Sequence, residues 1–306
     1  MEYFEENITV PCSHVPMYVT KASGKRVKFQ PSKVRRTCLR AGASSKLARE
    51  ITKNLSRSIY DGMSTRKVLD LILAELARTN PQVAARYNLK QAMLELGPAG
   101  FVFEKFIVRF LREYGYEAYC PPILKGACIP HEVDILARRP IRNKISNGVN
   151  QGKAYMIECK YHNARGIYTG SKDILYVWAR FLDLKEAGEK RFDEAWIISN
   201  TKFSIHAIEY GQCKKMRLLG WKYPAERGLE KLIEAKQLYP VTILRGMDRA
   251  TRDKLFSNDF IFCQDLIKTE KHLIMKRTGI KEKKLRALIN EASNLLGGQT
   301  TFSSAL

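Results

Sequence analysis

Long hydrophobic runs are missing from this sequence of 306 residues. No stretch approaches the roughly 18 uninterrupted apolar residues that a membrane-spanning helix needs. The first residues, MEYFEENITV, contain acids where a secretory signal has basic residues, and no apolar segment follows them. We therefore expect neither a membrane span nor a secretory signal.

Cysteine pairs at metal-binding or redox spacing are also missing. The seven cysteines are scattered along the chain and form no CxxC pair. This pattern is typical of free thiols in a reducing compartment, rather than of disulfides or a zinc site. The sequence therefore predicts a cytoplasmic protein.

Acidic residues are scarce relative to basic ones. The chain has 53 Lys and Arg against 31 Asp and Glu, which gives a formal net charge of +22 at pH 7. This excess favours a polyanionic partner such as nucleic acid, nucleotides or an anionic membrane surface, while a merely solvated basic surface stays open. The hydrophobic content of 45% excludes wholesale disorder, and the length allows two or three domains.

The first hundred residues have the pattern of a short hairpin followed by helices. Strands are expected at residues 17–21 and 26–29, around a turn at Ser23-Gly24-Lys25. Helices are expected at 31–41, at 45–60, from 64–65 onward, and at 81–96. Gly97-Pro98-Ala99-Gly100 then reads as a joint between domains.

The segment YVTKASGKRVKFQPSKVRRTCLRAG, followed by YDGMSTRKVLDLI, resembles the ATP-cone, the nucleotide-binding regulatory module of ribonucleotide reductases and their repressor. A Lys-rich turn and a helix with inward basic side chains can clamp a triphosphate. The resemblance implies that ATP or dATP binds as a regulatory ligand. Val19 and Lys21 would line the site, Lys33 would reach the phosphates, and Thr65 would position the base or the phosphates.

This chain departs from the cone pattern at one turn. The family often has Lys-Arg-Asp-Gly where this chain has Lys21-Ala22-Ser23-Gly24, so an arginine is missing. The alternative is therefore a degenerate cone that serves only as a surface for dimerisation or docking.

From residue 101 onward helices and strands alternate, which indicates an α/β domain. The expected strand 154–161 ends with Glu158 and Lys160, which share a face because alternate residues of a strand point the same way. Such a charged pair at the end of an apolar strand is costly without a partner or a task. Asp134 lies in the neighbouring expected strand 132–137, and Glu104 lies on the helix that precedes it.

These carboxylates would form an oxygen-rich pocket suited to Mg²⁺. We predict that Asp134 and Glu158 bind the metal, that Glu104 supports the metal or its water, and that Lys160 assists the nucleophile. The alternative is a surface ion pair between Glu158 and Lys160, with Asp134 as a turn cap.

An Asp followed by ExK, after a helical Glu, resembles the PD-(D/E)xK nuclease superfamily. Phe103-Glu104, Val133-Asp134-Ile135 and Ile157-Glu158-Cys159-Lys160 are similar to its Mrr-type restriction endonuclease branch. The resemblance covers about residues 99 to 222 and implies a restriction-endonuclease-like α/β core with a mixed sheet. Ile129-Pro130 precedes the strand, so the literal Pro-Asp dipeptide is absent.

After Tyr223-Pro224 the pattern is helical to the end of the chain. The segment around Gly279, with Lys281, Lys283 and Lys284 after it, is similar to helix-hairpin-helix modules, which hold the DNA backbone. It has one glycine where that family usually has two. An ordinary helical bundle that serves dimerisation is the alternative.

The predicted fold class is a multidomain α/β chain. It has a mostly helical ATP-cone at 1–98, a PD-(D/E)xK nuclease domain at 99–224 and an all-helical, DNA-binding domain at 225–306. The sequence predicts a nucleotide-regulated, Mg²⁺-dependent DNA endonuclease, expected to be a homo-oligomer and to act in defence against foreign DNA. The rivals are a nucleotide-responsive DNA-binding regulator with an inactive nuclease fold, and a nuclease that acts on RNA.

Overall fold

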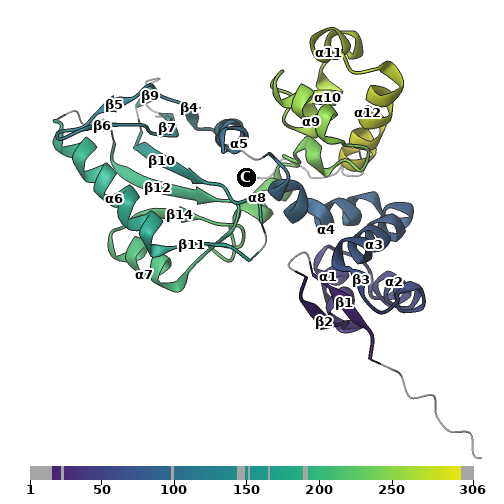
Figure 1. Ribbon diagram of the computed structural model, residues 1–306. Coiled ribbons are helices and arrows are strands. Elements are labelled where there is room, and N and C mark those ends of the chain that lie inside the picture. Colours follow the sequence, from purple (N-terminus) through teal and green to yellow (C-terminus); the bar gives the residue numbers. More distant parts are fainter. Residues whose placement is uncertain are drawn as a thin grey trace, which may run out of the picture. The chain divides into compact units, whose positions relative to one another are not determined.

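The computed structural model describes residues 16–21, 24–97, 100–142, 149–150, 152–164, 166–188 and 192–297. The chain divides into two compact units, residues 1–87 and 88–306, which are described separately (Figure 1). Ser23 of the predicted turn, Cys12, and Pro98 and Ala99 of the predicted joint lie outside the described residues. The bounds of the three predicted domains stay predictions.

The N-terminal unit combines a small sheet with helices. Its strand β1 (Tyr18–Thr20) pairs antiparallel with β2 (Arg26–Lys28) and parallel with β3 (Met63–Ser64). The helices are α1 (Pro31–Arg40), α2 (Ser45–Ser58), α3 (Thr65–Thr79) and α4 (Pro81–Leu94), the last of which crosses the unit boundary. The expected hairpin and helices are present, whereas β3 was not predicted.

Local side-chain contacts set the ends of these elements. Pro31 occupies the first position of α1, where its missing N–H is not needed. The hydroxyls of Ser44 and Ser64 cap α2 and α3 by accepting hydrogen bonds from backbone N–H groups at 3.2 Å. Asp61 accepts a hydrogen bond from the Tyr18 N–H at 2.9 Å and pairs with Arg26, so it fastens the hairpin to the turn before β3.

A five-stranded mixed sheet forms the centre of the second unit, in the order β14-β12-β10-β7-β4. Its strands are β4 (Glu117–Tyr119), β7 (Ile135–Arg138), β10 (Ala154–Lys160), β12 (Glu194–Ser199) and β14 (Arg217–Leu219). The strands β10, β12 and β14 are parallel, and β7 is antiparallel to both of its neighbours. The predicted mixed α/β character is therefore confirmed.

Helices cover both faces of this sheet (Figure 1). One face packs against α6 (Ser171–Glu186) and α7 (Ile205–Cys213), in a core that includes Met156, Ile197 and Phe181. On the other face α5 (Phe101–Glu113) lies against β10 and β7. Because side chains alternate along a strand, residues of β10 two apart from Met156 point toward α6.

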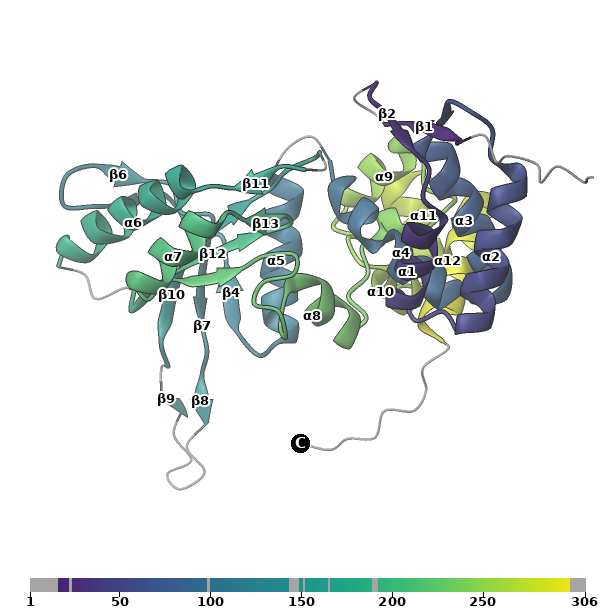
Figure 2. The ribbon, with the colours of Figure 1, turned by 90° about the horizontal axis from the view of Figure 1, so that it is seen from below.

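Short strand pairs extend the loops of this unit. They are β5 (Leu124–Lys125) with β6 (Pro130–His131), β8 (Ile141–Arg142) with β9 (Val149–Asn150), and β11 (Tyr168–Thr169) with β13 (Lys202–Phe203). The pair β8–β9 continues the hairpin between β7 and β10 away from the sheet (Figure 2). The expected strand 132–137 is corrected, because β7 starts at Ile135, after a bend at Asp134.

The described C-terminal region is helical, as predicted. It contains α8 (Leu229–Ala235), a 3₁₀ turn (Val241–Ile243), α9 (Arg249–Phe256), α10 (Cys263–Lys268), α11 (Lys271–Thr278) and α12 (Glu282–Leu296). Gly279 has φ 62°, a left-handed conformation that costs glycine least, and it ends α11 just before α12.

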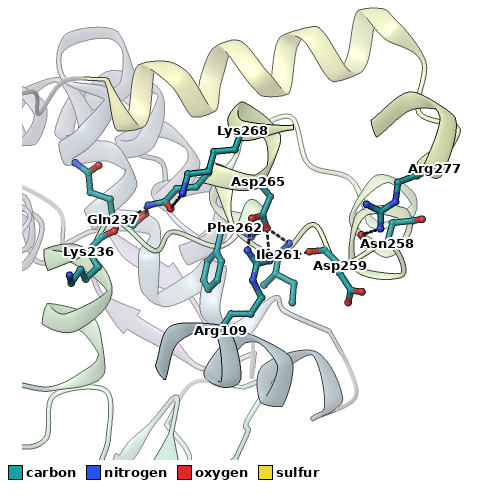
Figure 3. A network of polar contacts seen from close by, with 11 residues as sticks. Arg109, Lys236, Gln237, Asn258, Asp259, Ile261, Phe262, Asp265, Lys268 and Arg277 are labelled. Carbon is teal, nitrogen blue, oxygen red and sulfur yellow. Dashed lines mark hydrogen bonds and ion pairs between the residues drawn. The ribbon is translucent and has the colours of Figure 1, made fainter. Parts of the chain in front are cut away.

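A polar and aromatic network joins these C-terminal helices to α5 (Figure 3). Arg109 of α5 forms a two-pronged ion pair with Asp265, whose Oδ2 also accepts from the Ile261 N–H at 2.9 Å. The Arg109 guanidinium lies 4.7 Å from the centre of the Phe262 ring, and the Phe106 ring is 4.9 Å from the same ring. The C-terminal helices therefore hold the helix on which Glu104 lies.

Two predictions from the sequence, on membrane spans and on cysteines, can be compared with the described residues. No helix in the described ranges is both long enough and apolar enough to cross a membrane. The six described cysteines are free thiols, as the scattered spacing predicted.

Candidate functional site

A buried carboxylate with two cationic partners lies at the end of β10. Glu158 is 5% exposed, and its Oε1 accepts a hydrogen bond from Lys160 Nζ at 2.7 Å. Its Oε2 pairs with Arg180 of α6, whose side chain is 10% exposed. Glu158 and Lys160 thus point to the same face, as strand alternation predicts. Glu158 is buried and Lys160 is half-buried, so the pair lies at the edge of the core.

Asp134 lies beside this pair, directly before β7. The antiparallel ladder ends where Ile135 pairs with Ile157, so Asp134 and Glu158 are the next residues on the two strands. Asp134 Oδ2 accepts a hydrogen bond from the Cys159 N–H at 2.7 Å. Burial, followed by the negative charge of Glu158, raises the pKa of Asp134 to about 7, although the Cys159 N–H opposes the shift.

Glu104 approaches from the helix on the other face of the sheet. It lies in the first turn of α5. Burial raises its pKa, and the charges of Glu132 and Glu158 add to the increase. The charge of Glu104 in turn contributes to the raised pKa of Asp134. The fold therefore brings the four predicted residues, Glu104, Asp134, Glu158 and Lys160, to one end of the sheet.

The carboxylate oxygens at this end of the sheet are suitable ligands for a hard divalent cation. Within the described ranges no group of three or more His, Cys, Asp or Glu side chains is arranged to hold one metal ion. Mg²⁺ usually needs only one or two carboxylates, because water and substrate phosphates complete its octahedron. Asp134 and Glu158 fit that smaller set. Burial is the main cause of the raised pKa of Asp134, and the charge of Glu158 comes second; a cation held by these carboxylates would offset the second contribution.

Arg180 belongs to this site, although the sequence did not predict it. Its guanidinium lies 4.7 Å from the centre of the Tyr176 ring, and its buried Nε has no hydrogen-bond partner among the described residues. On α6 it borders the apolar stripe of Val177 and Phe181. An arginine at the edge of an otherwise apolar face was the available signal, but sequence spacing does not reveal that this face covers Glu158.

A polar network fixes the chain just beyond β10. The Asn200 side chain accepts from the His162 N–H at 2.9 Å and donates to the His162 carbonyl at 2.8 Å. Thr169 Oγ1 contacts Ser199 Oγ at 2.8 Å and the His162 ring at 3.3 Å. Burial lowers the pKa of His162, which favours the neutral ring. These bonds tie the segment after Lys160 to the end of β12.

The predicted nucleotide site lies in the N-terminal unit. Parallel pairing of Val19 with Met63 and of Thr20 with Ser64 makes Lys21 and Thr65 the next residues of the ladder. Lys21, Lys33 and Thr65 are exposed.

The first turns of α1 and α3 supply Lys33 and Thr65 respectively. Thr65 begins α3, whose first N–H groups favour an anion. Lys33 lies in the first turn of α1. Val19 differs from the other three, because it is 5% exposed and packs in the core, so its side chain supports the sheet.

Comparisons with known proteins identify two segments. The model of the ATP cone domain matches residues 17–91, which confirms the predicted ATP-cone. The model described as AF1548-like, C-terminal, matches residues 239–296. The Mrr-type nuclease and the helix-hairpin-helix resemblances stay predictions.

Two relatives span a large part of the chain. An uncharacterized protein of Archaeoglobus fulgidus is 39% identical over 191 residues, which is 62% of this chain and 100% of that protein. The crystal structure of a protein of unknown function, AF1548, is 37% identical with a TM-score of 0.54, and it covers 66% of this chain and 100% of its own. The chain therefore belongs to the AF1548-like family, and it has an ATP cone domain in addition.

Proposed function

We propose that this protein is a nucleotide-regulated, Mg²⁺-dependent DNA endonuclease. The supporting observation is that Asp134 lies opposite Glu158 and Lys160 at one end of a mixed sheet that has α5 on one face and α6 on the other. This is the arrangement that the resemblance to PD-(D/E)xK nucleases implies. The net charge of +22 supports a polyanionic substrate.

Each residue of the site has a role that its surroundings favour. Asp134 and Glu158 would hold the cation, and Glu104 would support it or its water. A bound Mg²⁺ would supply a Lewis acid for the phosphate and lower the pKa of a bound water. Lys160 would orient the attacking oxygen and stabilise the negative charge that develops on the phosphate. Arg180 would keep the Glu158 carboxylate in place from the side of α6.

The ATP cone domain supports regulation by a nucleotide. ATP or dATP can change activity only if it binds two arrangements of the protein with unequal affinity. We expect such a change in the cleavage rate or in the oligomeric state, and homo-oligomer formation is part of the proposal. Lys33→Ala should remove the response to the nucleotide and leave basal cleavage intact.

The test compares plasmid cleavage by wild type, Lys160→Ala and Lys172→Ala with Mg²⁺, with and without ATP or dATP. Lys172 is a matched control, because it is an exposed lysine in the first turn of α6. Lys160→Ala should lower the cleavage rate about 100-fold or more, as the loss of one group that stabilises the developing charge does. Lys172→Ala should cut like wild type, and wild-type cutting by Lys160→Ala would overturn the proposal.

A second measurement does not depend on activity. Mg²⁺ should raise the melting temperature of the wild type, because a ligand that binds only the folded state stabilises it. Asp134→Asn should lose that increase while it keeps the shape of the side chain. If both proteins respond equally to Mg²⁺, then Asp134 does not hold the cation.

A DNA-binding regulator without cleavage is the second candidate function. One observation favours it: Glu158 is already neutralised by Lys160 and Arg180. Nucleotide-dependent DNA binding, without cleavage under any of these conditions, would establish this function instead. Replacing the plasmid with RNA tests the remaining rival, a nuclease that acts on RNA.

A further inference from the structure

A basic groove runs between α1 and α2 in the N-terminal unit. Its volume is about 590 Å³. Four of its residues are cationic, three have hydroxyl groups, and two are apolar. The lining residues are Pro31, Ser32, Arg35, Arg36, Leu39, Arg49, Thr52, Lys53 and Ser56.

Helical periodicity builds this groove from both helices. On α1 the core side chains Val34 and Cys38 are one turn apart, and the lining residues Arg35 and Leu39 follow them on an adjacent stripe. On α2 the lining residues occur at 49, 52, 53 and 56, which is the spacing of one helix face. The groove is thus a regular feature of two packed helices, and it does not depend on a loop.

The cations of the groove have no ion-pair partner in the part of the chain that the structure describes. Together α1 and α2 contain eight Lys and Arg and one acid, Glu50. Arg35, Arg36, Arg49 and Lys53 are exposed, and among the described residues none of them forms an ion pair or a hydrogen bond through its side chain. Like charges that gather without a counter-charge repel one another, so an external anion would relieve this repulsion.

The groove and the predicted nucleotide site use different residues of α1. Lys33 lies on a third side of α1, since it shares a stripe with Thr37, whose hydroxyl donates to the Lys33 carbonyl at 2.8 Å. Neither Lys33 nor Thr37 lines the groove. On the buried side of α1 the core stripe with Val34 and Cys38 lies between Lys33 and the groove. On the exposed side Arg36 of the groove is three residues from Lys33, so the two sites border each other there.

We propose that this groove binds the phosphodiester backbone of nucleic acid. Arginine, lysine and hydroxyl side chains are the groups that usually contact phosphates. No aromatic side chain lines the groove, so no base would stack there and binding would not depend on sequence. A single nucleotide fits this lining less well, because small-ligand sites are lined mainly by hydrophobic and aromatic residues, whereas only Pro31 and Leu39 of the nine lining residues are hydrophobic. The inference does not need cleavage, and so it stands apart from the proposed nuclease.

The experiment removes two charges inside or outside the groove of the full-length protein. The groove variant is Arg35→Gln/Lys53→Gln, and the control is Lys46→Gln/Arg57→Gln, which removes the same charge from exposed positions of α2 that do not line the groove. Fluorescence anisotropy measures binding of duplex DNA and of single-stranded RNA at several salt concentrations, with EDTA present to prevent cleavage. Arg35→Lys tests whether the charge itself suffices.

For duplex DNA the slope of log affinity against log salt should become shallower by about 2 in the groove variant, since each lost phosphate contact removes about 0.9. The RNA slope should also fall, because both polymers present the same backbone. The control should keep the wild-type slope, and Arg35→Lys should keep wild-type binding. Equal losses in the groove variant and in the control would overturn the proposal, because net charge alone would then explain the effect.

A titration with ATP separates the groove from a nucleotide site. The groove variant should bind ATP as wild type does. If it loses ATP binding while Lys33→Ala keeps it, the groove holds a nucleotide and the proposal is wrong.

Discussion

Two of the basic regions that the structure describes use their positive charge in opposite ways. At the end of β10, Lys160 and Arg180 both bind Glu158, and all three side chains are largely withdrawn from water. Along the α1–α2 groove, the cations such as Arg35 and Lys53 are exposed, and no described acid, Glu50 included, forms an ion pair with them. Net charge from the sequence cannot separate these cases. The presence or absence of an internal partner decides whether a cation stabilises the fold or is available to another molecule.

The largest loss of stability should follow from removing one of the two cations that bind Glu158. Arg180→Met leaves Glu158 buried with Lys160 as its remaining partner, and the loss of one member of a buried ion pair typically costs about 3–5 kcal/mol. We expect the free energy of unfolding of the second unit to fall by about 3 kcal/mol. Denaturant unfolding, followed by tryptophan fluorescence, measures it, because all three tryptophans lie within 88–306.

The double variant Arg180→Met/Glu158→Gln is the control for this prediction. Removing the carboxylate together with the arginine should restore part of the lost stability, because the buried charge is then gone and only the half-buried Lys160 has lost its partner. If the double variant is less stable than Arg180→Met, the cost comes from packing of Arg180 on Tyr176 rather than from its charge.

A smaller loss of stability should follow from replacing Asp183, an acid that is held mainly by hydrogen bonds. Asp183 of α6 accepts hydrogen bonds from the Cys128 N–H at 2.7 Å and from the His131 ring at 2.6 Å. Burial opposes the ionisation of Asp183, but these hydrogen bonds outweigh it and lower its pKa to about 2. Because the folded pKa lies below the ordinary value of 3.8, the ionised form stabilises the fold above pH 3.8. This contribution is lost as the pH falls through about 2.

Asp183→Asn should therefore unfold more easily than wild type at neutral pH. The difference in melting temperature should shrink as the pH decreases from 3.8 toward 2, where Asp183 becomes protonated in the wild type. Thermal scans of both proteins across that range measure the difference. A difference that stays constant over the whole range would mean that shape, and not ionisation, matters at Asp183.

The sequence predicts the longer elements of this fold well. The apolar run at 154–161 predicts β10 to within one residue, because a buried strand needs apolar side chains on both faces. The two-residue strands, such as β3 and β6, were missed because a pair of residues has no periodicity and depends on a distant partner. Pairing of Pro130–His131 with β5 and the bend at Asp134 also shorten the expected strand at 132–137.

The candidate site was predictable where local geometry sets it. Glu158 and Lys160 share a face because they are two residues apart in a strand, and the hairpin register brings Asp134 opposite them. Arg180 was not predictable, because its position depends on how α6 packs across the sheet. Val19 was assigned to the nucleotide site by resemblance, and its place between two outward residues of β1 is what buries it in the core.

The smallest expected effect is on DNA binding, and it concerns two neighbouring lysines of α12 that differ in their ion-pair partners. Lys283 is exposed and has no ion pair among the described residues, whereas Lys284 is 2.9 Å from an Asp248 oxygen. Glu282 does not neutralise Lys283, because its carboxylate already binds Lys271 and Arg286. If the hairpin before α12 holds DNA, Lys283 is available to a phosphate and Lys284 is not.

Each lysine changed to glutamine removes one positive charge from nearly the same place. Lys283→Gln should make the slope of log DNA affinity against log salt shallower by about 0.9, the value for one lost phosphate contact. Lys284→Gln should change it less, because Asp248 already compensates that charge in the free protein. Anisotropy titrations with duplex DNA in EDTA compare the two variants with wild type. Equal slopes for wild type and Lys283→Gln would remove α12 from the DNA-binding surface and favour the interpretation of this region as a helical bundle.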